Sequence, residues 1–259
     1  MISFDNHIIL DKIDSWPEEV LGHIKNNESS LRGFFEEEHR INNLANENIL
    51  AKYNRPYNIH HNKWTNTIFK IEKILKNYSI VGIHCTKILE TEIHDIQQHG
   101  LKPLSKEFAN QRIEKIYKEG LISNELRNEL LNKEELDSDN RKGSISVFHC
   151  LSTLKYEWGL NKLFGFWGGE AIYSYVKNSE ELRKIGIPCI VLTSIRITEF
   201  NIYPELSKRM LSYYFDNNLY PHDTDSFIKK ELKVLRIIKR DEKIFEDLTH
   251  IQTWEDEIH

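Results

Sequence analysis

Cysteine and long apolar segments are both scarce in this sequence. The three cysteines, Cys85, Cys150 and Cys189, show no CxxC spacing, which argues against a disulfide framework and against a zinc site. No apolar run approaches the roughly 18 residues of a membrane helix, and the first residues lack the basic and apolar regions of a secretory signal. We therefore expect a reduced cytoplasmic protein, without a metal requirement and without a membrane partner.

Positive charge is not in excess either. The 259 residues carry a net charge of -5, and a composition of 39% hydrophobic and 29% charged residues is ordinary for a soluble protein. This balance gives no overall case for a nucleic-acid or membrane surface as the partner. The local exception is the basic run from Lys229 to Lys243, which is either a solvated face or a contact for a phosphate backbone.

Residues 1–78 are predicted to form a helical N-terminal extension. A helix start is predicted at residues 14–19, where two acids follow Pro17, and Gly33 is predicted to interrupt the next helix. A third helix is predicted from an apolar stripe formed by Trp64, Ile68, Ile71, Leu75 and Tyr78. The His60-His61 pair suggests a metal site, but adjacent helical residues face different ways, so two exposed side chains are the better interpretation.

Residues 79–259 are predicted to form an α+β domain. Buried strands are predicted at residues 80–86, 145–151, 187–192 and 232–238. A helix with a left-handed cap at Gly100 is expected after the first strand. A helical insertion is predicted at residues 105–136 with a break at Gly120, followed by a solvated loop at residues 137–143.

The first polar stretch that could form a catalytic or binding site is His84-Cys85-Thr86, at the end of the first strand. A sheet holds the backbone there, while the side chains emerge at its edge. The alternative is a hydrogen-bonded structural histidine. His149, in the second strand, shows how weak a single histidine is as evidence.

The second stretch is Trp167-Gly168-Gly169-Glu170, which leads into a helix that carries Tyr173. Two glycines let a backbone approach a ligand closely, and a helix start suits an anion such as a pyrophosphate. A tight turn with core aromatics is the alternative, and the residues by themselves favour it.

The third stretch contains three acids close to the last strand, Asp223, Asp225 and Glu231. Carboxylates that enter a strand are aimed by the sheet, and one of them could face a cleft. The alternative is a solvated turn, which is the better interpretation of the stretch taken alone.

In this order the stretches resemble the ADP-ribosyltransferase superfamily, in particular its diphtheria-toxin and PARP-like branch. That branch begins its catalytic core with a strand that carries a His before a small residue and a hydroxyl residue, as in His84-Cys85-Thr86. The sequence Gly100-Leu101-Lys102-Pro103 is similar to the family's way of leaving its first helix. Tyr173 matches the aromatic that packs on nicotinamide, and Phe148 matches an earlier strand aromatic.

The resemblance covers about residues 79–245 and leaves the N-terminal helices uncovered. The family places a catalytic acid at the start of a late strand, and Asp223, Asp225 and Glu231 all stay candidates for that position. Should all three fail, Glu170 is the next candidate.

The resemblance implies a split, two-sheet β core and a mono-ADP-ribosyltransferase that uses NAD as its substrate. The acceptor would be a macromolecule, either protein or nucleic acid. The implied NAD site consists of His84, Cys85, Thr86, Phe148, Trp167, Gly168, Gly169, Glu170 and Tyr173. The implied catalytic residues are His84, Tyr173, and Asp225 or Glu231. Similar bacterial proteins include toxins and phage-defence effectors, a context that would add an antitoxin or immunity partner.

Two other interpretations remain at this point. One is a catalytically inactive NAD- or nucleotide-binding module on the same fold, in which no acid lies near His84 and Tyr173. The other is a structural or interaction protein in which the three stretches belong to the core and no pocket joins them.

Overall fold

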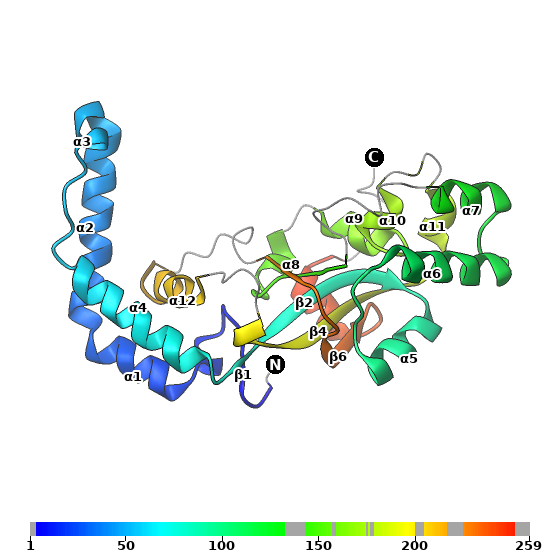
Figure 1. The fold of residues 1–259 in the computed structure, drawn as a ribbon, viewed down its shortest axis with the longest axis horizontal. Helices are drawn as coiled ribbons and strands as arrows, with labels where there is room; N and C mark the ends of the chain where they lie inside the picture. The colour runs from blue at the N-terminus through cyan, green and yellow to red at the C-terminus, as the bar shows by residue number, and fades with distance from the viewer. Residues whose placement is uncertain are drawn as a thin grey trace. The chain divides into compact units, whose positions relative to one another are not determined.

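The computed structural model describes residues 4–132, 143–156, 159–174, 176, 179–199, 205–216 and 225–251. Most of the predicted loop at residues 137–143, and Asp223 with it, lie outside these ranges. The chain divides into two compact units, shown as a ribbon in Figure 1. The first unit contains residues 1–80, 196–198 and 205–220, and the second contains residues 81–195, 199–204 and 221–259.

The first unit is mainly helical. Its described elements are β1 (His7–Ile8), a 3-10 turn (Ile13–Ser15), α1 (Glu18–Asn26), α2 (Glu28–Glu47), α3 (Ile49–Tyr53), α4 (His61–Leu75) and α12 (Leu206–Asp216). Helix α1 begins after Pro17 with two acids in its first turn, as predicted, because acids complement the positive end of the helix dipole. Helix α4 packs against α1, α2 and α12. Its buried side chains are Ile68, Ile71 and Leu75 of the apolar stripe, together with Thr67.

Gly33 does not interrupt a helix, which corrects the prediction. Helix α2 continues through it from Glu28 to Glu47. A Cβ atom at this position would lie 2.7 Å from Nε2 of His60, so the glycine makes room for the imidazole ring. His60 is therefore half-buried against α2, whereas His61 is exposed.

The second unit contains most of a four-stranded sheet with the strand order β1-β2-β4-β6. The long strands are β2 (Ser79–Ile88), β4 (Ile187–Arg196) and β6 (Lys233–Lys239). The first two residues of β2 pair in parallel with β1 inside the first unit, and β4 is antiparallel to β6. Strand β4 is almost entirely buried, as its continuous apolar run predicts.

A second, small sheet pairs β3 (Ile145–Val147) with β5 (Ser226–Ile228) in antiparallel fashion. Directly after β3, the main chains of Phe148 and Ile83 exchange two hydrogen bonds of 2.8 and 2.9 Å, which join the small sheet to β2. The predicted strand at residues 145–151 is therefore shorter than expected, because the chain leaves the β3–β5 pairing at Phe148 to form this bridge. A mixed sheet beside a small antiparallel one is compatible with the α+β class.

Helices cover the second unit. They are α5 (Glu90–His99), α6 (Lys106–Lys118), α7 (Asn124–Leu131), α8 (Thr153–Tyr156), α9 (Leu160–Gly165), α10 (Glu170–Tyr173), α11 (Glu180–Lys184) and α13 (Lys243–Thr249). The predicted helical insertion corresponds to α6 and α7, with the break at Gly120. Gly100 ends α5 with a positive φ of 86°, but its ψ of 172° is extended rather than left-handed helical.

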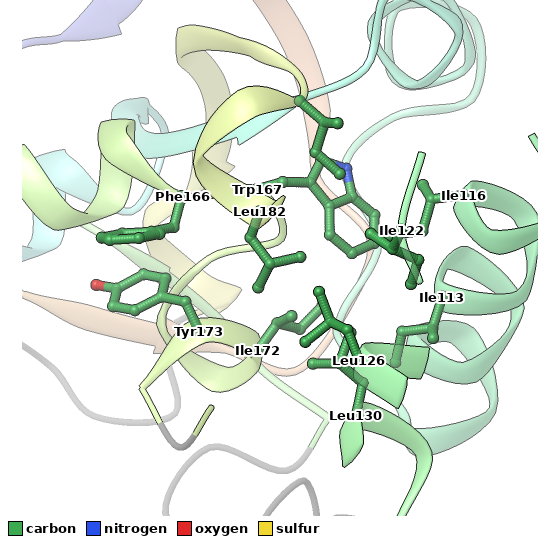
Figure 2. Close-up of a cluster of buried hydrophobic side chains, with 11 residues drawn as sticks. Ile113, Ile116, Ile122, Leu126, Leu130, Phe166, Trp167, Ile172, Tyr173 and Leu182 are labelled. Carbon is green, nitrogen blue, oxygen red and sulfur yellow. The ribbon is translucent and has the colours of Figure 1, made fainter. Parts of the chain in front are cut away.

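One buried hydrophobic cluster of the second unit joins α6 and α7 to the segment between α9 and α11 (Figure 2). Ile113 and Ile116 of α6 and Leu126 and Leu130 of α7 meet Trp167, Ile172, Tyr173 and Leu182 there. The insertion is therefore packed into the second unit by side chains on one of its faces, which leaves another face of α6 for a different role.

Candidate functional site

A pocket of about 1330 Å³ lies within the second unit. Its described lining comes from β2, α5, α6, β3, the segment from α9 to α11, and β5. This volume exceeds the roughly 300–1,000 Å³ of most small-molecule sites, so it suits a ligand as large as a dinucleotide. Of the predicted site residues, the lining includes His84, Cys85, Thr86, Phe148, Gly168, Gly169, Glu170, Tyr173 and Asp225.

Strand β2 brings the His-Cys-Thr triplet to the pocket. Cys85 and Thr86 are nearly buried, whereas His84 is half-buried. Nδ1 of His84 lies 2.9 Å from the carbonyl oxygen of Ser146 in β3. A carbonyl oxygen only accepts, so Nδ1 carries the proton and Nε2 of the neutral ring is left as an acceptor.

The surroundings of His84 favour its neutral form. Burial lowers the pKa of His84 and the charge of Arg112 lowers it further, while the hydrogen bond to Ser146 acts in the opposite direction. At neutral pH the imidazole is therefore uncharged. Such a ring can accept a hydrogen bond from a ligand hydroxyl, as a positioning group requires.

Lys87 attaches the Trp-Gly-Gly turn to β2. Its Nζ donates to the carbonyl oxygens of Gly165, at 3.2 Å, and of Arg183. Its own carbonyl oxygen accepts from the backbone N–H of Gly168 at 3.1 Å. Burial, followed by the charges of Arg240 and Arg183, lowers the pKa of Lys87 to about 8. The lysine thus connects β2 to the Trp-Gly-Gly turn and to α11.

The turn itself needs glycine. Gly168 has a φ of 91°, and a Cβ atom there would lie 2.6 Å from Cδ1 of Ile172, so a side chain would be both strained and obstructed. Helix α10 after the turn has only four residues, which is too short for the anion-binding helix start that the sequence suggested. The two glycines instead let the backbone form part of the pocket wall.

Trp167 does not line the pocket, in contrast to the expectation. Its side chain is fully buried in the cluster shown in Figure 2, and its Nε1 donates to Oε2 of Glu92 at 2.9 Å. The Trp167 ring of the turn is therefore part of the hydrophobic core.

Tyr173 belongs to both the core cluster and the pocket lining. Its ring faces that of Phe166, with centroids 5.2 Å apart and an interplanar angle of 31° (Figure 2). With 9% of its surface exposed, the ring is held rigidly and presents a small part of its surface to a ligand. Phe148 and Phe227 add two further aromatic side chains to the lining.

Among the candidate acids, the pocket distinguishes Asp225 from Glu231. Asp225 is exposed, lines the pocket and directly precedes β5. Glu231 is exposed in the connection from β5 to β6 and is not part of the described lining. Glu170 lines the pocket on the side of the Trp-Gly-Gly turn. Asp225 is therefore the acid that best combines a pocket position with the start of a late strand.

Arg112, which the sequence interpretation missed, lines the pocket from α6. Its guanidinium carbon is 4.7 Å from the centroid of the Trp167 ring, and its Nε is 2.6 Å from Oε1 of Glu92. Burial raises the pKa of Glu92, but the charge of Arg112 and the hydrogen bonds from Arg112, Leu89 and Trp167 outweigh burial and hold that pKa below its usual value. Glu92 is thus an ionised anchor that fixes the direction of Arg112.

The basic run from Lys229 to Lys243 offers less free charge than the sequence suggests. Lys230 pairs with Glu199, Arg236 with Glu242 at 2.7 Å, and Lys239 with Glu90 at 2.5 Å. Acids therefore neutralise three of its cations, and the run is a weaker contact for a phosphate backbone than its composition indicates.

Within the ranges that the structure describes, no group of three His, Cys, Asp or Glu side chains lies close enough to hold a metal ion. In the same ranges, no helix combines the length and the apolar character that crossing a membrane requires.

Comparison of the chain with protein-family models, with curated proteins and with solved structures finds no match.

Proposed function

We propose that the chain is a mono-ADP-ribosyltransferase that consumes NAD at the pocket of the second unit. The observation that carries this proposal is that one pocket is lined by His84, Thr86, Tyr173 and the acid Asp225. The resemblance implies His84, Thr86 and Tyr173 for the NAD site, and Asp225 is one of its candidates for the catalytic acid. The four residues come from three separate stretches of the chain. On this proposal, the mixed and small sheets correspond to the split β core of that family.

The chemistry requires the bond between nicotinamide and C1′ of the ribose to break, with its electron pair leaving on nicotinamide. A nucleophile of the acceptor then forms the new bond to C1′ and loses its proton. Positive charge develops on the ribose in the transition state, as in glycoside hydrolysis. A carboxylate beside the ribose stabilises that charge, and we assign this role to Asp225, with Glu170 as the second candidate.

The other residues would bind and orient the substrate. Nε2 of His84 and the hydroxyl of Thr86 would accept and donate hydrogen bonds to the adenosine half, and the ring of Tyr173 would stack on nicotinamide. The neutral state of His84 supports this assignment, because a neutral ring accepts a hydrogen bond through Nε2. Cys85 and the backbone of Gly168 and Gly169 would complete the wall.

The acceptor is proposed to be a macromolecule, protein or nucleic acid. A role as a toxin or phage-defence effector, with an antitoxin or immunity partner, is part of the same proposal and is supported by the resemblance only. Because acids pair with three cations of the basic run, the run gives no clear preference for nucleic acid.

The test uses the purified full-length chain and NAD labelled in its adenylate phosphate. Label should move to macromolecules in a cell extract, and sensitivity of the product to nuclease or to protease identifies the acceptor class. The matched variant Asp225→Asn should transfer little label. Label that stays entirely in NAD, with wild-type protein and every extract, would reject the proposal, and NAD binding without any turnover would favour the inactive binding module.

A further inference from the structure

Helix α6 has two adjacent faces with different surroundings. Ala109, Ile113 and Ile116 are buried, and the two isoleucines belong to the hydrophobic cluster with α7. The neighbouring face lines the pocket through Phe108, Gln111, Arg112 and Lys115, at spacings of three and four residues that place them on one side of a helix. The packed face therefore fixes the position of the pocket face.

The pocket face of α6 brings two cations and no acid to the lining. Arg112 is held between the Trp167 ring at 4.7 Å and the Phe108 ring at 5.8 Å. Lys115, one turn later, is exposed and donates to Oγ1 of Thr91 at 2.8 Å. Both side chains are thus oriented toward one region of the wall.

The hydrogen bonds of Glu92 leave part of Arg112 available. Oε1 of Glu92 accepts from Nε of Arg112, while Oε2 accepts from the backbone N–H of Leu89 and from Nε1 of Trp167. The carboxylate of Glu92 consequently binds the guanidinium of Arg112 through Nε. The two terminal nitrogens of the guanidinium can donate to another acceptor. A stacked, oriented arginine beside a lysine is the arrangement that recognises phosphate oxygens.

We propose that α6 provides the diphosphate-binding wall of the pocket, with Arg112 and Lys115 contacting the bridging phosphates of a nucleoside diphosphate group. The identification of that group with the pyrophosphate of NAD rests on the proposed function. The binding chemistry itself requires only an ADP-like ligand. Arg112 and Lys115 thereby become specificity residues that lie in the helical insertion, outside the three stretches that carry the resemblance.

The test measures, by calorimetry on the full-length protein, the affinities of ADP and of adenosine, which lacks the phosphates. Lys115→Gln should lower the affinity for ADP about tenfold, which is the loss expected for one charge-assisted hydrogen bond. The affinity for adenosine should not change. Lys118→Gln, the same change in the last turn of α6 and outside the described lining, should alter neither affinity.

A single Arg112 variant would leave Glu92 buried without its partner and could fail to fold. The paired variant Arg112→Gln with Glu92→Gln removes both charges and keeps one amide oxygen as the acceptor for Trp167 and Leu89. It should weaken ADP at least as much as Lys115→Gln does, and raised salt should reduce the difference from wild type.

The outcomes separate this inference from the proposed function. ADP affinities equal to wild type in both variants, or an equal loss for adenosine, would overturn the diphosphate wall, even if nicotinamide is released from NAD. Variant-sensitive ADP binding without any nicotinamide release would support the wall and reject the transferase. A wild-type protein that binds ADP no better than adenosine would also overturn the wall.

Discussion

His84 lies in β2 and His149 lies two residues after β3, and the two rings make the same kind of backbone contact in different surroundings. Each ring approaches a main-chain carbonyl oxygen through Nδ1, that of Ser146 at 2.9 Å for His84 and that of Val81 at 3.1 Å for His149. The second nitrogen separates them. For His149 it lies 2.9 Å from the Ser226 hydroxyl and the side chain is fully buried, whereas His84 lines the pocket.

The comparison shows that residue type and a predicted position in a strand do not identify a functional histidine. The surroundings of the second ring nitrogen separate a structural histidine from one that can bind a ligand. His149 connects β2, through Val81, to β5, through Ser226, and Ser226 directly follows Asp225. We therefore expect His149 to hold the strand that presents the acid, and His84 to contact the ligand.

The largest effect is expected at the acid that His149 supports. Asp225→Asn should lower the turnover of NAD by about 10²-fold or more, because the carboxylate acts on charge that develops in the transition state, and should leave NAD affinity largely intact. Steady-state nicotinamide release and calorimetry measure the two quantities. The control is Glu231→Gln, which should retain full turnover. Equal turnover in wild type and Asp225→Asn would mean that another residue is the catalytic acid, and Glu170→Gln would be the next variant to test.

The next effect is on stability. His149→Ala should lower the free energy of unfolding by about 1–3 kcal/mol, since it leaves buried hydrogen-bond partners without the ring. Urea denaturation measures the loss. Unchanged stability would contradict the buried structural role assigned to His149.

The matching variant, His84→Ala, should have the reverse profile. NAD affinity should fall about tenfold through the loss of a hydrogen bond to the ligand, while the free energy of unfolding should change less than in His149→Ala. Calorimetry and urea denaturation on the two variants complete the comparison. If His84→Ala loses stability and keeps NAD affinity, the two histidines have been assigned the wrong way round.

A smaller effect is expected at the aromatic wall. Tyr173→Leu keeps an apolar side chain in the core cluster but removes the ring. The affinity for NAD should fall about fivefold, in line with roughly 1 kcal/mol for aromatic stacking. Turnover should fall together with affinity, because stacking exists in both the ground state and the transition state. Tyr173→Phe is the control, and it should bind NAD like wild type. A loss confined to turnover would argue against stacking.

The smallest effect is a pH dependence. The pKa of His84 is lowered in the folded protein, first by burial and then by the charge of Arg112. The unfolded chain then binds the proton more readily, so the stability contribution is complete above about pH 6.5 and is lost as the pH falls toward the folded value. The stability of wild type should thus decline more than that of His84→Gln between pH 7.5 and pH 5.5, measured by urea denaturation. An equal loss of stability in wild type and His84→Gln would contradict a buried, neutral His84 ring.

Long apolar patterns allowed much of the fold to be predicted. The runs that became β2, β4 and β6 and the stripe of α4 were all visible in the sequence, because burial on one or both faces leaves a periodic record. Strand β5 was not predicted, since its three residues are too few for a pattern and its pairing partner, β3, is distant in the sequence.

The site was predictable only in part, and for a physical reason. His84, Thr86, Tyr173 and Asp225 belong to stretches whose composition is unusual, so they attracted attention. Arg112 lies in an ordinary amphipathic helix, and its direction is set by Glu92 and Trp167, which are distant in sequence. The spacing of Phe108, Arg112 and Lys115 was the available signal, but periodicity does not reveal which face of a helix meets a cavity.

The most direct test of the account is the release of nicotinamide from NAD by the purified full-length protein, followed by chromatography. We predict release that depends on time and on protein concentration, that is weakened at subsaturating NAD by His84→Ala, and that is nearly lost in Asp225→Asn. A wild-type protein that neither binds NAD nor releases nicotinamide, in the presence and absence of a cell extract as the acceptor source, would contradict the assignment of the pocket to NAD.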